Sequence, residues 1–300
     1  IMDFEEDWYE DQDLYDLRKS LITGEHSDIW EKTCKECIES EKHHAKSYRT
    51  YALDKIRQSD ELTEGLSKII DSFKLTGEIF ADRRMYNIKG RGFGNECNLK
   101  CYMCAPHFST SRTTEMTKMS DQSLDSVFPD ITVDQAKDLL VFSKTIPKRK
   151  DETKDQLLKV IETLKPQIRQ ISLGGGEPVM IKEYYELLDS LIETGDSREI
   201  IMSMNTNCTR TGTHTYDMLD YVDAFKEFTV LVSIDDLYER DEFIRYPSKF
   251  DTVLNNLDRY VNETNCDVRV NITWSLLNIS NAREIINFFR QRGLQFSKSV

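Results

Sequence analysis

The segment RQISLGGGEPVMIKEYYELLDSLIE, residues 169–193, holds one complete strand–loop–helix unit. Residues 169–176 have the pattern of a β-strand that ends in three glycines. A helix is predicted after them, because apolar side chains recur three and four positions apart. These side chains are Tyr184, Leu187, Leu188, Leu191 and Ile192. A strand that leads directly into a helix is the repeating unit of an α/β fold.

The same unit recurs along the chain. Further strands are predicted at residues 84–90, 199–207, 227–235, 267–275 and 294–300. Helical faces lie between them, formed by Leu157, Val160, Ile161 and Leu164, by Phe250, Val253, Leu254, Leu257 and Val261, and by Ala282, Ile285, Ile286 and Phe289. This alternation predicts a parallel sheet with crossover helices. Five or six such units form a partial barrel or an open sheet, and both place a ligand at the carboxyl ends of the strands.

The first part of the chain has a different texture. Residues 28–80 are predicted to be helical, because glycine is sparse there and no proline precedes Pro106. Residues 3–16 carry eight acidic side chains and no basic one, which is typical of a solvated or weakly ordered lead-in. We therefore expect an acidic, mainly helical extension over residues 1–80.

Composition limits the classes of partner. Apolar residues make up 39% and charged residues 31% of the chain, as in ordinary globular proteins. A formal net charge of -13 argues against binding nucleic acid over the whole surface. The sequence has neither a membrane-spanning run nor a signal-peptide pattern. The chain has seven cysteines, an odd number, and the close spacing of five of them suits metal binding in a reducing compartment, which predicts the cytoplasm.

Three cysteines follow the first predicted strand. Cys97, Cys101 and Cys104 have the spacing C-x3-C-x2-C, and no fourth cysteine is near. Thiolates select zinc or iron–sulfur clusters. Three of them would leave one iron of a four-iron cluster open to another ligand. The alternative is a zinc site that takes His107 as its fourth ligand.

Polar residues also follow the other strands. Gly174, Gly175, Gly176, Glu177 and Pro178 come after the second strand, and Glu177 is expected to project into a site. Asn205, Asn207, Ser233, Asp235, Asp236 and Arg245 come after the third and fourth. The alternatives are loop capping for the asparagines and aspartates, and a surface salt bridge from Arg245 to Asp241 or Glu242.

With C-x3-C-x2-C after one strand and GGEP after the next, the chain resembles the radical S-adenosylmethionine (radical SAM) enzymes over residues 84–296. The resemblance implies that Cys97, Cys101 and Cys104 hold a 4Fe–4S cluster, whose electron cleaves S-adenosylmethionine to a 5′-deoxyadenosyl radical that abstracts hydrogen from a substrate. It also implies a flavodoxin- or ferredoxin-like electron donor. The residues implied to bind S-adenosylmethionine are Met103, Gly175, Gly176, Glu177, Asn205, Asn207, Ser233 and Arg245. The family usually has an aromatic residue where Met103 stands, whereas here the aromatic is Tyr102.

The implied fold is a partial (β/α)6 TIM-like barrel over residues 81–300 behind the helical extension. The polar stretch 105–150 is expected to be an insertion that acts as a lid or substrate loop. Because the chain stops at Val300, near the sixth strand, the C-terminal part of the barrel or a twitch extension is expected to be absent.

A second cysteine pair, Cys34 and Cys37, lies in the helical extension before His43 and His44. The pair is predicted to bind an auxiliary iron–sulfur cluster, to bind zinc with one histidine, or simply to pack. Its segment resembles the twitch-containing, peptide-modifying radical SAM proteins, which implies a peptide or protein substrate. The alternatives are a small-molecule or nucleoside enzyme similar to the carboxy-deazaguanine synthases, and a non-enzymatic zinc or iron–sulfur binding module.

Overall fold

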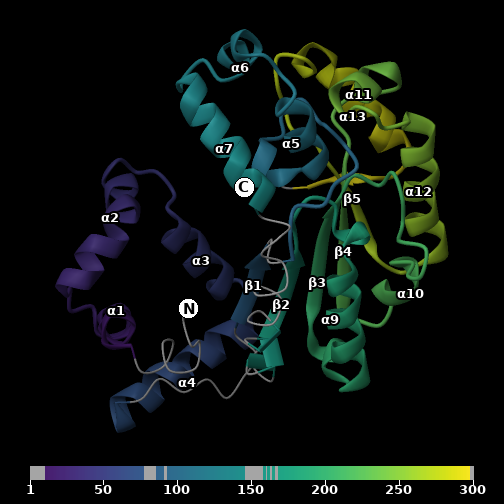
Figure 1. The fold of residues 1–300 in the computed structure, drawn as a ribbon. Helices are drawn as coiled ribbons and strands as arrows, with labels where there is room; N and C mark the ends of the chain where they lie inside the picture. Colours follow the sequence, from purple (N-terminus) through teal and green to yellow (C-terminus); the bar gives the residue numbers. More distant parts are fainter. Residues whose placement is uncertain are drawn as a thin grey trace. The chain divides into compact units, whose positions relative to one another are not determined.

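Six strands form a single sheet in chain order (Figure 1). In this computed structural model the described residues are 11–77, 86–90, 93–145, 158–159, 161–162, 164–165 and 168–297. The strands are β1 (Tyr86–Gly90), β2 (Ile168–Leu173), β3 (Ile201–Thr206), β4 (Glu227–Ser233), β5 (Asp267–Asn271) and β6 (Gln295–Phe296). From β2 to β6 every neighbouring pair is parallel. The six predicted strands and the parallel α/β class are thus confirmed.

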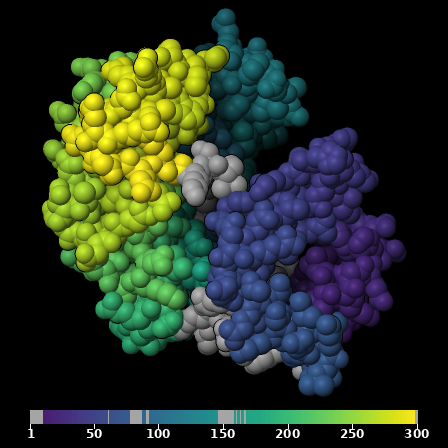
Figure 2. Space-filling model, turned by 180° about the vertical axis from the view of Figure 1, so that it is seen from behind, coloured from purple at the N-terminus to yellow at the C-terminus, as the bar shows by residue number. Residues whose placement is uncertain are grey.

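One face of the sheet is apolar and buried. It carries Ile171, Leu173, Met202, Met204, Val230, Val232, Val268 and Val270. The helices α9 (Lys182–Glu193), α12 (Phe250–Glu263) and α13 (Ala282–Gln291) follow β2, β4 and β5 and bury the apolar faces predicted for them. Figure 1 shows α9 and α12 along one side of the strands, and Figure 2 shows α13, in yellow, at the surface. Ile192 and Val261 lie at the exposed edges of their helices.

The opposite face of the sheet is more polar. Ser172 pairs in register with Ser203, and Ser203 with Thr229. The hydroxyls of Ser172 and Ser203 lie 2.7 Å apart in a hydrogen bond across the two strands. Alternate side chains point to opposite faces of a strand, so this polar row shares its face with Asn205 and Ser233. The polar face therefore leads to the carboxyl ends of β3 and β4.

Four helices form the N-terminal region: α1 (Gln12–Thr23), α2 (Asp28–Lys42), α3 (Tyr48–Arg57) and α4 (Asp60–Thr76). Each begins at a residue whose side chain accepts a hydrogen bond from a backbone amide of the first turn, namely Asp11, Ser27, Ser47 and Ser59. The predicted helical character is confirmed within 28–76. The expectation of a weakly ordered lead-in is wrong for residues 12–16, which belong to α1, and residues 3–10 lie outside the described chain.

The insertion after β1 is helical. It contains the 3₁₀ helix η2 (Pro106–Phe108), then α5 (Thr110–Met116), α6 (Asp121–Val127) and α7 (Val133–Thr145). Met116, Leu124 and Leu140 form a small buried core among these helices. Residues 106–145 thus form a packed helical subregion, and its role as a lid or substrate loop stays a prediction.

The helix predicted before β2 falls partly outside the described residues, which exclude Leu157 and Val160, while Ile161 and Leu164 are buried. The short helices α10 (Leu219–Val222) and α11 (Glu239–Ile244) complete the described elements. By its internal contacts the chain divides into two compact units, residues 1–86 with 160–168 and residues 87–159 with 169–300. No helix among the described residues is long and apolar enough to span a membrane.

Candidate functional site

The glycine loop after β2 packs directly against the backbone of the cysteine loop. The amide of Glu177 donates a 2.6 Å hydrogen bond to the carbonyl of Glu96. A Cβ on Gly176 would lie 2.2 Å from that same oxygen, so no larger residue fits without moving the cysteine loop. Gly175 has a φ of +134°, which favours glycine, and a Cβ there would lie 2.9 Å from the carbonyl oxygen of Gly94. The glycines therefore permit close approach of the two loops.

The last residue of α11 and the residues after it hold the cysteine loop from another side. The amide of Lys100 donates to the carbonyl of Tyr246 at 2.7 Å, and the amide of Tyr102 donates to the carbonyl of Ile244 at 2.8 Å. The hydroxyl of Ser111 donates to the carbonyl of Cys97 at 2.7 Å. The backbone of the loop is thus fixed by three different parts of the second unit.

The three predicted cysteines lie together. Cys97 and Cys101 are buried with Leu99, and Cys104 and Met103 pack against this group. The side chain of Tyr102 is 66% exposed and points away. Met103 thus occupies the inner position beside the cysteines, where the resemblance placed an aromatic residue.

Hydrogen-bond donors surround the two buried sulfur atoms. The amide of Leu99 lies 3.4 Å from the Cys97 Sγ, and the Asn207 Nδ2 lies 3.8 Å from it. The Arg245 Nη1 lies 3.8 Å from the Cys101 Sγ. Donors and a cation at this distance stabilise an anionic sulfur ligand.

Burial raises the pKa of Cys97 to about 11 and that of Cys101 to about 12, so both thiols keep their protons when no metal is bound. The donor set fits an iron–sulfur cluster: three thiols from one short loop, an apolar shell, and donors aimed at sulfur. The zinc site with His107 stays an alternative prediction. No three His, Cys, Asp or Glu side chains of the described residues converge closely enough to hold a single metal ion.

Glu177 does not project into the site as expected. Its side chain is 1% exposed and turns toward the end of β3. One carboxylate oxygen accepts from the Thr206 hydroxyl at 2.7 Å, and the other from the Asn207 amide at 2.6 Å. Burial raises the pKa of Glu177 to about 7, against the opposing effect of these hydrogen bonds. Its carboxylate therefore joins the loops after β2 and β3.

Asn207 joins a network that includes the cysteine loop. Its Nδ2 donates to the Asn98 Oδ1 at 3.0 Å, and its Oδ1 accepts from the amide and hydroxyl of Thr209. The Asn98 Nδ2 donates to the Thr209 hydroxyl at 2.9 Å. Asn205, in contrast, is exposed, and Ser233 is partly buried, both on the polar face of the sheet. The two predicted asparagines thus have different surroundings.

Arg245 lies in a buried charge network rather than at the surface. Its Nε is 2.7 Å from the Asp235 Oδ2, and its side chain is 10% exposed. The Asp241 Oδ1 accepts from the amides of Asp235 and Asp236, and burial raises the pKa of Asp241 to about 6. The alternative of a surface salt bridge is therefore wrong. Asp236 instead caps its own loop by accepting from the Leu237 amide at 2.8 Å.

Sequence reasoning missed Asn98, Thr209 and the Arg245–Asp235 pair. Asn98 lies inside the cysteine motif, and Thr209 lies two residues beyond Asn207. Their closeness in sequence to residues already predicted for the site was the signal that could have identified them. Their partners are distant in sequence, which no spacing rule reveals.

The second cysteine pair lies in the first unit, on α2, where both side chains are partly buried. Burial raises the pKa of the Cys34 thiol, and the Arg49 guanidinium opposes the shift. Within the described part of the chain no histidine converges with Cys34 and Cys37 into a three-ligand metal site. Zinc binding and an auxiliary cluster at this pair therefore both stay predictions.

The model of the Radical SAM superfamily matches residues 92–290. Among solved structures, anSMEcpe with bound AdoMet and Kp18Cys peptide is 17% identical with a TM-score of 0.44, over 70% of this chain and 49% of that one. Streptococcus suis SuiB bound to S-adenosylmethionine is 14% identical with a TM-score of 0.43, over 96% and 57% of the two chains. This chain thus spans about half the length of these structures. No curated protein sequence matches it.

Proposed function

This chain belongs to the radical SAM superfamily and is an enzyme, and on that premise we propose that Cys97, Cys101 and Cys104 hold a 4Fe–4S cluster. The observation that carries this proposal is the set of donors around the buried sulfurs, from Leu99, Asn207 and Arg245. When bound, the cluster and S-adenosylmethionine supply the electron transfer and the 5′-deoxyadenosyl radical that characterise the superfamily. A flavodoxin- or ferredoxin-like protein would be the electron donor.

The roles of the binding residues follow from their surroundings. Gly175 and Gly176 would offer backbone carbonyls to the methionine amino group, and the Glu177 carboxylate, which accepts from Thr206 and Asn207, would hold in place the loop that presents them. Asn205 and Ser233, on the polar face, would bind the ribose hydroxyls. These groups position the cofactor from one side of the sheet.

Two further residues complete the cofactor site. Met103 would pack on the adenine, because its apolar side chain lies inward beside the cysteines. Arg245 would hold positive charge beside the cluster and the methionine carboxylate, because Asp235 keeps its guanidinium in place. Asn207 would act on the cluster rather than on the ribose, since its amide nitrogen faces Cys97.

For the substrate we favour a peptide or protein side chain. The support is the resemblance of the Cys34–Cys37 segment to twitch-containing, peptide-modifying proteins, together with a polar sheet face that leads to the site. Deuterium transfer tests this directly. A peptide substrate with deuterated side chains should yield 5′-deoxyadenosine that contains deuterium, whereas transfer only from a nucleoside would reject the peptide assignment.

Anaerobic reconstitution tests the reaction itself. The reconstituted protein should bind about four irons at the main site and, with a strong reductant, release 5′-deoxyadenosine and methionine. Cys101→Ala should abolish this release, and Cys34→Ala should retain it. Cys266→Ala is the matched control, because Cys266 is a partly buried cysteine of the same unit whose Sγ contacts Thr264 and Tyr260. Stoichiometric zinc with no iron absorbance and no release would contradict the proposal.

A further inference from the structure

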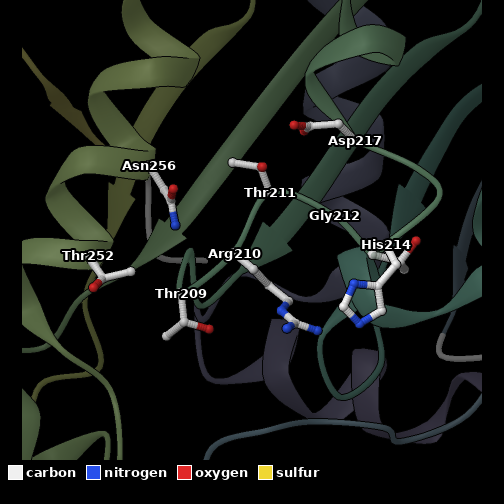
Figure 3. Close-up of a pocket in the computed structure, with 9 residues that line it drawn as sticks. Thr209, Arg210, Thr211, Gly212, His214, Asp217, Thr252 and Asn256 are labelled. Carbon is white, nitrogen blue, oxygen red and sulfur yellow. The ribbon is translucent and has the colours of Figure 1, made fainter.

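A separate pocket of 320 Å³ lies beside the candidate site, at the loop that follows β3 (Figure 3). The loop forms one wall and the first two turns of α12 form the other. The lining residues are Thr209, Arg210, Thr211, Gly212, Thr213, His214, Asp217, Thr252 and Asn256. All of them belong to the second compact unit. None was assigned a role by the motifs of the sequence.

Two basic side chains enter this pocket without an acidic partner. Arg210 and His214 are exposed, and Figure 3 shows the Arg210 guanidinium and the His214 ring on the same side of the loop. Neither forms an ion pair with any described residue. The one acidic lining residue, Asp217, lies 3.5 Å from the guanidinium of Arg259. Asp217 is thus engaged by another cation, which leaves the Arg210 guanidinium as the lining charge that has no ion pair among the described residues.

The loop that carries these side chains is held in shape. Gly212 forms an antiparallel bridge with Asp217, and a Cβ at Gly212 would lie 2.0 Å from the carbonyl oxygen of Tyr216. The Thr213 hydroxyl accepts from the amides of Thr215 and Tyr216 at 3.2 and 3.1 Å. A preorganised loop loses little conformational entropy when a ligand binds. The loop therefore already has a fixed backbone conformation before a ligand binds.

The opposite wall is the first part of α12. Thr252 lies in the first turn of α12, a 14-residue helix whose N-terminus has no side-chain cap. The Asn256 Nδ2 donates to the carbonyl of Cys208 at 2.9 Å and so ties the helix to the loop. The amide of Phe250, the first residue of α12, already donates to the Glu242 Oε1 at 3.1 Å, so we assign the attraction for an anion to the basic side chains and not to the helix N-terminus.

The pocket also adjoins the cysteines. Thr209 lines it and bonds both Asn98 and Asn207, and the Asn207 Nδ2 lies 3.8 Å from the Cys97 Sγ. We propose that this pocket is a subsite that binds a carboxylate of the peptide substrate. This proposal rests on the peptide assignment above. A guanidinium fork matches a carboxylate in a bidentate way. The volume suits one side chain rather than a whole peptide.

Solution NMR of the full chain tests the proposal without turnover. The probe is N-acetyl-glutamate N-methylamide, titrated against the Arg210 Nε–Hε and His214 ring signals, with the glutamine analogue and inorganic phosphate as separate arms. The glutamate probe should move both signals in a saturable way. Arg210→Gln should weaken its binding by about tenfold, because a charge-assisted hydrogen-bond pair is lost. Arg290→Gln, which removes an exposed charge on α13, should leave it unchanged.

Three outcomes would overturn the carboxylate subsite: no saturable shift, an equal response to the glutamine analogue, or a response to phosphate alone. Because the experiment needs neither iron nor S-adenosylmethionine, its failure is distinguishable from failure of the radical reaction. If Arg210→Gln perturbs folding, the glutamate-against-glutamine comparison on the unaltered chain still decides the result.

Discussion

Replacing Gly176 with alanine should disrupt the cysteine loop, although Gly176 itself lies in the loop after β2. The new Cβ would lie 2.2 Å from the Glu96 carbonyl oxygen and 2.5 Å from that of Asn95, and both are backbone atoms that cannot rotate away. Restoring ordinary contact requires the loop to retreat by about 1 Å. The retreat also lengthens the 2.6 Å hydrogen bond from the Glu177 amide. Overpacking and the weakened bond together cost about 2–4 kcal/mol.

Hydrogen exchange of the protein without added iron measures this cost locally. The amides of Lys100 and Tyr102 are bonded to the carbonyls of Tyr246 and Ile244, so their exchange rates report whether the loop stays in place. A destabilisation of this size should speed their exchange by about 30-fold or more. The variant should also take up less iron on anaerobic reconstitution.

Gly195→Ala is the matched control. Gly195 has a φ of +81°, but a Cβ at this position would have no other atom within 4 Å. The change therefore strains the backbone by about 1–2 kcal/mol without touching the cysteine loop. The hydrogen-exchange rates of the cysteine-loop amides should stay as in the unaltered protein. Unchanged exchange and full iron binding in Gly176→Ala would refute the reasoning, because the glycine would then not be needed for close packing.

Three other expectations concern the buried network. Arg245→Ala should lower the free energy of unfolding, measured with urea, by about 3–5 kcal/mol, because it leaves the buried carboxylate of Asp235 unpaired. The control Arg283→Ala, at an exposed position, should change it by less than about 0.5 kcal/mol. Glu177 has a pKa of about 7 in the folded protein against 4.5 in the unfolded chain. Its contribution to the free energy of unfolding should therefore fall by about 3 kcal/mol as the pH rises from 4.5 to 7, and then level off. The same dependence of the unfolding free energy on pH in Glu177→Gln would contradict this. Asn207→Ala removes a donor from the Cys97 sulfur and should lower the cluster potential by about 20–60 mV, measured by redox titration, and an unchanged potential would exclude that role.

The sheet could be predicted from sequence because its strands are apolar runs with clear boundaries. The helices α9, α12 and α13 are long enough to show a repeating apolar face. The helices of the insertion could not be predicted, because α5 and α6 have seven residues each and bury few apolar side chains. Helices of this length are too short for their apolar side chains to show a helical spacing in the sequence.

The site was predictable in its residue types more than in their contacts. The cysteine spacing and the glycines followed directly from the sequence. The orientation of Glu177 did not, because its partners Thr206 and Asn207 come from the next strand end. Arg245 similarly pairs with Asp235 across a turn instead of with the nearer Glu242. Side-chain partners across loops depend on the packed structure, which local patterns do not encode.

The contacts that hold the cysteine loop also set an order for its biogenesis. Glu177 and Tyr246, which bind the backbone of Glu96 and Lys100, are synthesised long after the cysteines themselves. A nascent chain that ends before Tyr246 therefore carries its three thiols on an unsupported loop, and closing such distant contacts early is entropically costly. The cysteine loop can therefore gain all of these contacts only after the first four strands have been translated.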